Sequence, residues 1–142
     1  MTEQPAAGPR GKKMPKDRAA ADPWDQVRRE FGLYSISELA GWLDFGGPEN
    51  LRARLLTGKA RVLAVADKAG IRYPGFQFDE TRRRVIPVVK DITALGRRSG
   101  WRDEELLQWF CRPNPLLSGK RPVDVLQDEE HLLPAAEQDL SR

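Results

Sequence analysis

Side chains that could read DNA are grouped in one short stretch of the sequence, where they alternate with leucines or follow them: Asn50, Arg52, Arg54, Lys59 and Arg61. In the major groove, arginine binds guanine edges with two hydrogen bonds, and asparagine binds adenine edges in the same way. Lys59 and Arg61 are placed to neutralise flanking phosphates, which strengthens binding without specifying sequence. The spacing therefore predicts a DNA-binding helix. An ordinary surface helix with exposed arginines is the alternative.

A DNA-binding helix of this kind needs a second helix and a tight turn to present it. Ser35 to Glu38 has the pattern of a capping box. The apolar residues around and after it recur at the spacing of one helical face: Ile36, Leu39, Ala40 and Leu43. Residues 44–48 contain two glycines and a proline, which predicts a turn, and Pro48 suits the first position of the next helix. This order is that of a helix-turn-helix, whose second helix enters the major groove.

Two β-type runs follow the second helix directly. Residues 62–65 and 71–73 flank a four-residue turn containing glycine, which predicts a β-hairpin. A hairpin in this position is the wing of a winged helix-turn-helix, and Lys68 at its tip would contact phosphates. We expect residues 24–85 to form this winged domain. The basic turn over residues 81–84 either contacts nucleic acid or is simply solvated.

The last part of the chain, residues 86–142, has the pattern of a compact helical domain. One helix begins at Pro87, a second covers residues 101–111, and a short helix runs over residues 134–140. The predicted fold is therefore mainly α, a small winged helix-turn-helix with one β-hairpin followed by a helical C-terminal domain. The second helix carries a broad apolar surface, which predicts docking of a partner protein. Packing of that surface onto the helix over residues 87–97 is the alternative.

The charges are distributed unevenly along the 142 residues, whose net charge is only +3. Residues 1–100 carry 19 Lys and Arg against 12 Asp and Glu, a balance of +7, whereas residues 101–142 carry 5 against 9, a balance of −4. The basic part suits nucleic acid, and the acidic part suits a different partner. Residues 1–23 hold five basic groups, four prolines and almost no large apolar side chain, which predicts a disordered basic tail.

The sequence contains no catalytic or metal-binding arrangement. The single histidine, His131, has no nucleophile beside it in sequence. With one cysteine, Cys111, the chain supplies neither the usual zinc ligand sets nor an intramolecular disulfide. We therefore expect a protein that is not an enzyme and uses no metal or cofactor. Because the sequence lacks a long apolar run and a secretory signal, we also expect a cytoplasmic protein without a membrane partner.

Three motifs in the C-terminal part resemble the toxin-binding domain of Xre/MbcA/ParS-type antitoxins. They are Trp109-Phe-Cys-Arg-Pro-Asn-Pro115, Leu117-Ser-Gly-Lys-Arg-Pro122 and Val123-Asp-Val-Leu126, in a resemblance that covers roughly residues 86–140. Proteins of this class typically neutralise a toxin with a RES domain, a fold associated with NAD breakdown, and repress their own operon. The resemblance maps seven residues onto the partner-binding motif: Trp109, Asn114, Pro115, Leu117, Gly119, Pro122 and Leu126.

The N-terminal half resembles another class, the winged helix-turn-helix of excisionase and MerR-type proteins. This resemblance rests on Ser37-Glu-Leu-Ala40, the arginine-bearing helix and the hairpin. Together the two resemblances imply an antitoxin of a type II toxin–antitoxin system that binds operator DNA, as a homodimer on paired half-sites. Two alternatives stay open: a stand-alone transcription regulator whose C-terminal domain dimerises, and a protein-interaction adaptor that does not bind DNA.

Overall fold

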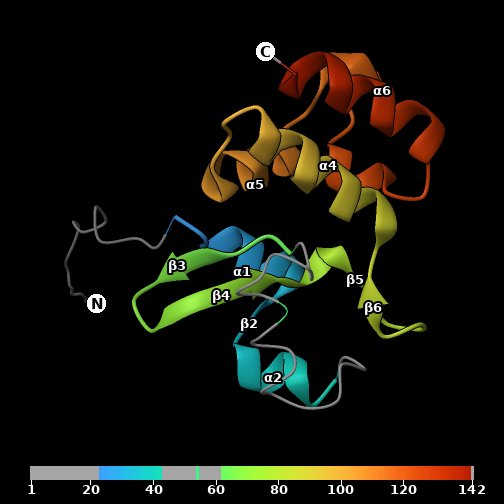
Figure 1. The fold of residues 1–142 in the computed structure, drawn as a ribbon. Coiled ribbons are helices and arrows are strands. Elements are labelled where there is room, and N and C mark those ends of the chain that lie inside the picture. The colour runs from blue at the N-terminus through green and yellow to red at the C-terminus, as the bar shows by residue number, and fades with distance from the viewer. Residues whose placement is uncertain (1–22, 43–53, 55–61, 142) are drawn as a thin grey trace, which may run out of the picture. The chain divides into compact units, whose positions relative to one another are not determined.

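The computed structural model describes residues 23–42, 54 and 62–141. Within these residues the fold is mixed and mostly helical, with small antiparallel sheets (Figure 1). The chain divides into two units between Glu30 and Phe31, and residues 1–22 of the predicted basic tail lie outside the described residues. All elements discussed below belong to the second unit, except for most of the first helix.

Two helices open the described part of the chain, and the second of them is the helix predicted after Ser35. Helix α1 (Asp25–Phe31) ends at Gly32, whose φ of +84° is one that glycine adopts without strain. Helix α2 (Ile36–Ala40) begins with the predicted capping box. The hydroxyl of Ser35 accepts the amide of Glu38 at 3.2 Å, and the Glu38 carboxylate accepts the amide of Ser35 at 2.8 Å. The second of these bonds lowers the pKa of Glu38.

Helix α2 is shorter than its apolar pattern predicts. Gly41 caps it directly after Ala40, so the helix does not continue to Leu43, which lies outside the described residues. Of the predicted face, Leu39 is buried and Ile36 is partly buried. A helix this short is held by its cap and by the burial of Leu39, because an isolated helix of five residues is not stable in water.

The predicted hairpin is confirmed, but its first strand begins later than expected. Strands β3 (Val65–Asp67) and β4 (Gly70–Pro74) pair antiparallel, and β2 (Leu33–Tyr34) adds to the other edge of β4. Residues 62–64 were predicted as strand and are not. The physical reason is that the Gln77 side chain bonds both the amide and the carbonyl of Leu63, at 2.8 and 3.0 Å, in place of a neighbouring strand.

A second, shorter hairpin was not predicted. After the 3-10 helix η1 (Gly75–Gln77), strand β5 (Phe78–Asp79) pairs with β6 (Arg84–Val85). The basic turn expected over residues 81–84 closes this hairpin. Two-residue strands carry no alternation of apolar and polar side chains, which is why the sequence pattern did not predict them.

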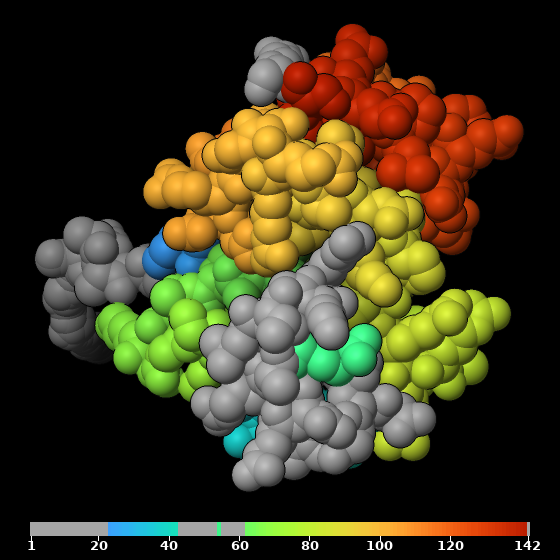
Figure 2. Space-filling view, in the orientation of Figure 1, coloured from blue at the N-terminus to red at the C-terminus, as the bar shows by residue number. Residues whose placement is uncertain are grey.

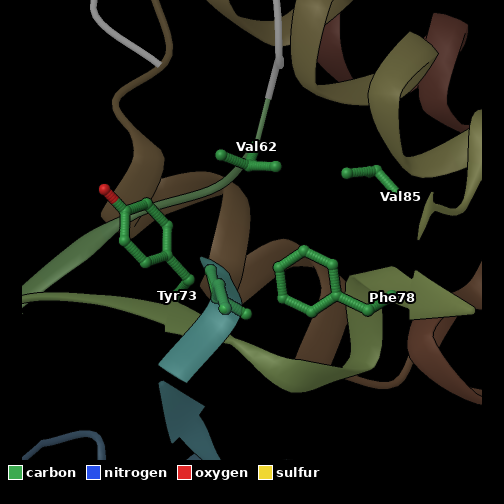
Figure 3. Close-up of a cluster of buried hydrophobic side chains, with 5 residues drawn as sticks. Val62, Tyr73, Phe78 and Val85 are labelled. Atoms are coloured by element: carbon green, nitrogen blue, oxygen red, sulfur yellow. The ribbon is translucent and has the colours of Figure 1, made fainter. Parts of the chain in front are cut away.

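A buried cluster joins α2 to both hairpins: Leu39, Val62, Tyr73, Phe78 and Val85. In Figure 3, Val62 and Val85 lie on one side of the rings of Tyr73 and Phe78. Trp42 packs against this cluster, and its ring meets that of Phe78 edge-on with a centroid separation of 5.8 Å. The aromatic residues that follow the hairpin therefore form core, as their apolar character predicts.

The C-terminal part is helical, as expected, and Figure 1 shows its three helices grouped together. Helix α4 packs against both α5 and α6. Two 3-10 helices, η2 and η3, connect α5 to α6. The bounds are α4 (Pro87–Arg98), α5 (Asp103–Cys111), η2 (Pro115–Leu117), η3 (Pro122–Val125) and α6 (Glu129–Leu140).

The last helix begins earlier than predicted. Helix α6 starts at Glu129, five residues before Pro134, which had been read as its first residue because proline favours that position. The buried stripe of the helix already includes Leu132, followed by Ala135, Ala136 and Leu140. Burial of Leu132 thus offsets the backbone hydrogen bond that Pro134 removes from the helix.

Candidate nucleic-acid interface

The turn of the β3–β4 hairpin is fixed by its own first residue. The Asp67 carboxylate accepts the amides of Ala69 and Gly70 at 2.8 and 3.1 Å, and the φ of Gly70 is +128°. This aspartate-turn geometry leaves Lys68 exposed at the tip of the hairpin. The structure therefore places Lys68 at the tip of the hairpin, as predicted, and its contact with a phosphate stays a prediction.

Two further residues of this hairpin are exposed or partly exposed and were not predicted as contacts. Ile71 is 53% exposed, which is unusual for a large apolar side chain in so small a sheet. The Arg72 guanidinium donates to the Ile71 carbonyl at 2.8 Å and lies 3.8 Å from the Asp67 carboxylate. Arg72 thus adds a second basic side chain to the hairpin, held beside the carboxylate that fixes the turn.

The β5–β6 turn supplies a second basic tip. The Asp79 carboxylate accepts the amides of Thr81 and Arg82 at 3.0 and 3.2 Å. Arg83 takes the left-handed conformation, with a φ of +54°, and its Nε donates to the Trp42 carbonyl at 2.9 Å. Trp42 is the last described residue before the predicted turn and DNA-binding helix. Arg83 therefore fixes the backbone just before that segment in the sequence.

The remaining predicted DNA contacts fall mostly outside the described residues. Asn50, Arg52, Lys59 and Arg61 lie there, whereas Arg54 is described, helical and exposed. Figure 2 shows the two hairpins projecting on opposite sides of one face, with β3–β4 in green and β5–β6 in yellow-green. Basic tips at both hairpins would let one face of the molecule follow a phosphate backbone.

The residues that lead into β3 are held from two sides. On one side, Gln77 is fully buried and its amide group makes three hydrogen bonds, two to the Leu63 backbone and one of 3.0 Å to the Pro74 carbonyl. These bonds satisfy the donors and acceptors that burial would otherwise leave unpaired. Leu63, just before β3, and Pro74, at the end of β4, are therefore both bonded to Gln77, three residues after the hairpin.

On the other side, an ion pair between α4 and α5 reaches the same residues. Arg97 and Asp103 form two parallel bonds of 3.0 and 2.7 Å. Arg97 also donates to the Val62 carbonyl at 2.8 Å, and Asp103 accepts the Ala64 amide at 3.0 Å. We call these four residues the α4–α5 clamp. The predicted border between domains, at residues 85 and 86, thus lies inside the compact unit Phe31–Arg142.

The residues predicted to bind a partner have different environments. Asn114, Leu117 and Pro122 are buried, and Leu126 is partly buried. The Asn114 side chain accepts the Leu116 amide at 2.9 Å and donates to Asp139 at 2.9 Å, so it shapes the loop rather than facing solvent. Their burial gives these positions a structural role that does not need a partner.

Other members of the predicted set border an open groove beside α5 and α6. Trp109 and Pro115 line it, together with Trp101 and Leu116, which were not predicted. Trp109 is fixed by a hydrogen bond of 2.9 Å to Asp139, and Leu116 is 42% exposed. Gly119 is exposed in the loop that follows, with a φ of +84°. The groove is the part of this region that a protein partner could contact.

The single histidine lies on the surface at the start of α6. Its Nδ1 is 3.0 Å from both carboxylate oxygens of Asp128, and this hydrogen bond raises the pKa of His131. Within the described ranges, no group of three or more His, Cys, Asp or Glu side chains is arranged to hold a metal ion. No described helix is long and apolar enough to cross a membrane.

Comparison with known proteins identifies a similar fold in one solved structure. No family model and no curated protein matches the chain. A solved structure, the NMR structure of Rv2175c, is similar: the match covers 84% of each chain with a TM-score of 0.59 and 23% sequence identity. At this level of sequence identity, the similarity shows the fold alone, which is mixed and mostly helical with small antiparallel sheets.

Proposed function

We propose that the chain is a DNA-binding regulator in which α2, the segment after it and the β3–β4 hairpin form a winged helix-turn-helix. The observation that carries this proposal is the hairpin itself, paired in register directly after the arginine-bearing segment, with Lys68 exposed at its tip. In a winged helix-turn-helix the wing lies beside the DNA-binding helix and contacts the neighbouring phosphates.

The anchoring of the hairpin supports this role. Contacts that position a protein on DNA gain most when the contacting groups are held in place before binding, because ordering them on binding has an entropic cost. Here Asp67 fixes the turn, Gln77 fixes Leu63 before β3, and Arg97 and Asp103 fix Val62 and Ala64 on either side of Leu63. Arg83 fixes Trp42, two residues after the end of α2, in the same way.

The salt dependence of DNA binding tests the wing. We expect the affinity for duplex DNA to fall steeply with salt, and Lys68→Ala to reduce the slope of log affinity against log salt by about 0.9, the contribution of one neutralised phosphate. Fluorescence anisotropy with a labelled duplex at several salt concentrations measures the slope. Lys120→Ala, which removes an exposed lysine from the loop before η3, is the control and should leave it unchanged.

Two results would contradict the proposal. A chain whose binding to DNA shows no salt dependence would be an interaction adaptor with a solvated basic half. Equal slopes of log affinity against log salt for the Lys68 and Lys120 variants would mean that the tip of the β3–β4 hairpin does not contact the DNA phosphates.

A second proposed function is binding of a protein at the groove beside α5 and α6, as expected for an antitoxin that neutralises a RES-type toxin. The specific observation in its favour is Leu116, which is 42% exposed on the groove rim next to the half-buried ring of Trp109. Exposed apolar side chains flanked by aromatic rings are typical of the centres of protein interfaces. The acidic balance of residues 101–142 favours a basic partner.

The partner is tested with the product of the neighbouring gene. Leu116→Glu should weaken its binding at least tenfold, because a charge is then buried in an apolar contact. Ile71→Glu is the control, since Ile71 is also an exposed large apolar residue but lies on the β3–β4 hairpin. Size-exclusion chromatography with light scattering separates the outcomes. A Leu116-dependent homodimer would favour the stand-alone regulator, and no Leu116-dependent complex at all would contradict this function.

A further inference from the structure

A cavity of about 290 Å³ lies beside α2 and is lined largely by aromatic rings. The rings come from segments far apart in the sequence: Phe31, Tyr34, Trp42 and Phe78. The charged groups that line the same cavity are two carboxylates, Glu38 and Glu80, and no lysine, arginine or histidine of the described chain lines it. Neither the wing nor the groove uses this site.

The rings are held in place by the backbone around them. A Cβ atom added at Gly32 would lie 2.6 Å from the Tyr34 ring, and one added at Gly75 would lie 2.7 Å from it. The ring of Tyr34 thus occupies the space that a side chain at Gly32 would fill, and at Gly75 it shares that space with the carbonyl oxygen of Phe31. Trp42 is fixed by its edge-on contact with Phe78, and Phe31 by a similar contact with Phe76 at 5.4 Å. The cavity walls are therefore formed before any ligand enters.

The chemistry of these walls is complementary to a positive charge. The face of an aromatic ring carries negative electrostatic potential and attracts cations within about 6 Å of its centroid. The ring of Phe31 already receives one cation, because the guanidinium carbon of Arg121 lies 5.9 Å from its centroid. The Glu38 carboxylate favours its ionised form, since the Ser35 amide donates to it. A neutral ligand would gain no charge attraction from the two carboxylates.

We propose that this cavity is a binding site for a small organic cation of the quaternary ammonium class. A quaternary ammonium group is weakly hydrated, so that aromatic faces replace its water more readily than they replace the water around a metal ion or a primary ammonium group. The two carboxylates supply the charge, and the four rings supply the selectivity for alkylated nitrogen.

The site also has a consequence that rests on the proposed DNA-binding function. Glu38 and Leu39 belong to α2, and Trp42 is the residue whose carbonyl Arg83 holds at the departure of the predicted DNA-binding helix. A ligand in the cavity therefore contacts α2 and Trp42, which precede the predicted DNA-binding helix in the sequence. The affinity for the cation and the affinity for DNA are coupled if α2 or Trp42 changes position when DNA binds.

Binding is tested directly by calorimetry with choline and its uncharged isostere 3,3-dimethylbutan-1-ol on the full chain. Choline should bind at least fivefold more tightly than the alcohol, since only choline interacts with the rings and carboxylates through charge. Glu38→Gln combined with Glu80→Gln should reduce choline affinity about fivefold, and glutamine retains the capping box at position 38. Glu104→Gln, on the exposed face of α5, is the matched control.

The site is further located by NMR. Choline should shift the backbone amide signals of residues 31–42 and 75–80, and Tyr34→Ala should reduce the shifts at equal ligand concentration. Equal affinity for choline and the alcohol, absence of choline binding, or shifts confined to other residues would overturn the proposal. None of these measurements needs DNA, so the cation site can fail while DNA binding stands, and the reverse holds as well.

Discussion

Replacing Gln77 with leucine is expected to lower the free energy of unfolding by about 3 kcal/mol or more, although the two side chains have similar volumes. The substitution removes one buried acceptor and one buried donor that serve three backbone groups: the amide and carbonyl of Leu63 and the carbonyl of Pro74. Each buried group left without a partner costs about 1 to 3 kcal/mol. Urea unfolding followed by far-ultraviolet circular dichroism measures the change.

The matched control is Gln127→Leu, because Gln127 is an exposed glutamine in the loop before α6. Its stability should stay within about 0.5 kcal/mol of the parent chain. Similar losses in the two variants would contradict the role assigned to Gln77. A loss of about 3 kcal/mol is a large share of the 5–15 kcal/mol that stabilises a typical domain.

The second large effect is expected at the predicted DNA-binding helix. Arg52→Ala combined with Arg54→Ala should weaken operator binding by about 2 to 6 kcal/mol, because each bidentate contact to a base is worth about 1 to 3 kcal/mol. Arg54 is helical and exposed, and Arg52 lies outside the described residues. A gel-shift titration at fixed salt, with DNA from upstream of the chain's own gene, measures the loss.

Arg98→Ala is the control for this pair, since Arg98 is an exposed arginine in the last turn of α4. It removes the same charge from a helix that the proposal does not place on DNA. If the double variant binds as tightly as the Arg98 variant, the assignment of the DNA-binding helix is wrong. A loss that is equal for operator and unrelated DNA would instead assign both arginines to phosphates.

Much of the local structure could be predicted because its causes lie within a few residues. The capping box of α2 needs only Ser35 and Glu38, and the start of α4 needs only Pro87 and the apolar residues after it. The β3–β4 turn follows from Asp67 and Gly70. In each case, short-range hydrogen bonds or a fixed φ act on the backbone directly, so the pattern in the sequence is the physical cause itself.

The contacts that position the candidate sites could not be predicted in this way. Gln77 and Leu63 are 14 residues apart, and Ala64 and Asp103 are 39 apart. In the sequence, Asp103 has the pattern of an ordinary acidic residue in the first turn of a helix. No neighbouring residue indicates its bonds to Arg97 and Ala64. The aromatic cavity likewise combines residues of α1, β2, β5 and the end of α2, whose proximity depends on the whole fold.

The α4–α5 clamp has a consequence for how freely the two halves of the chain can be exchanged. A fragment ending after Val85 would lack Arg97 and Asp103, and the Val62 carbonyl and Ala64 amide would lose the bonds that these side chains make. The β3–β4 hairpin therefore cannot be separated from α4 and α5 without loss of these hydrogen bonds. A graft of this hairpin onto another helical partner would have to carry an arginine and an aspartate at the equivalent places to restore these bonds.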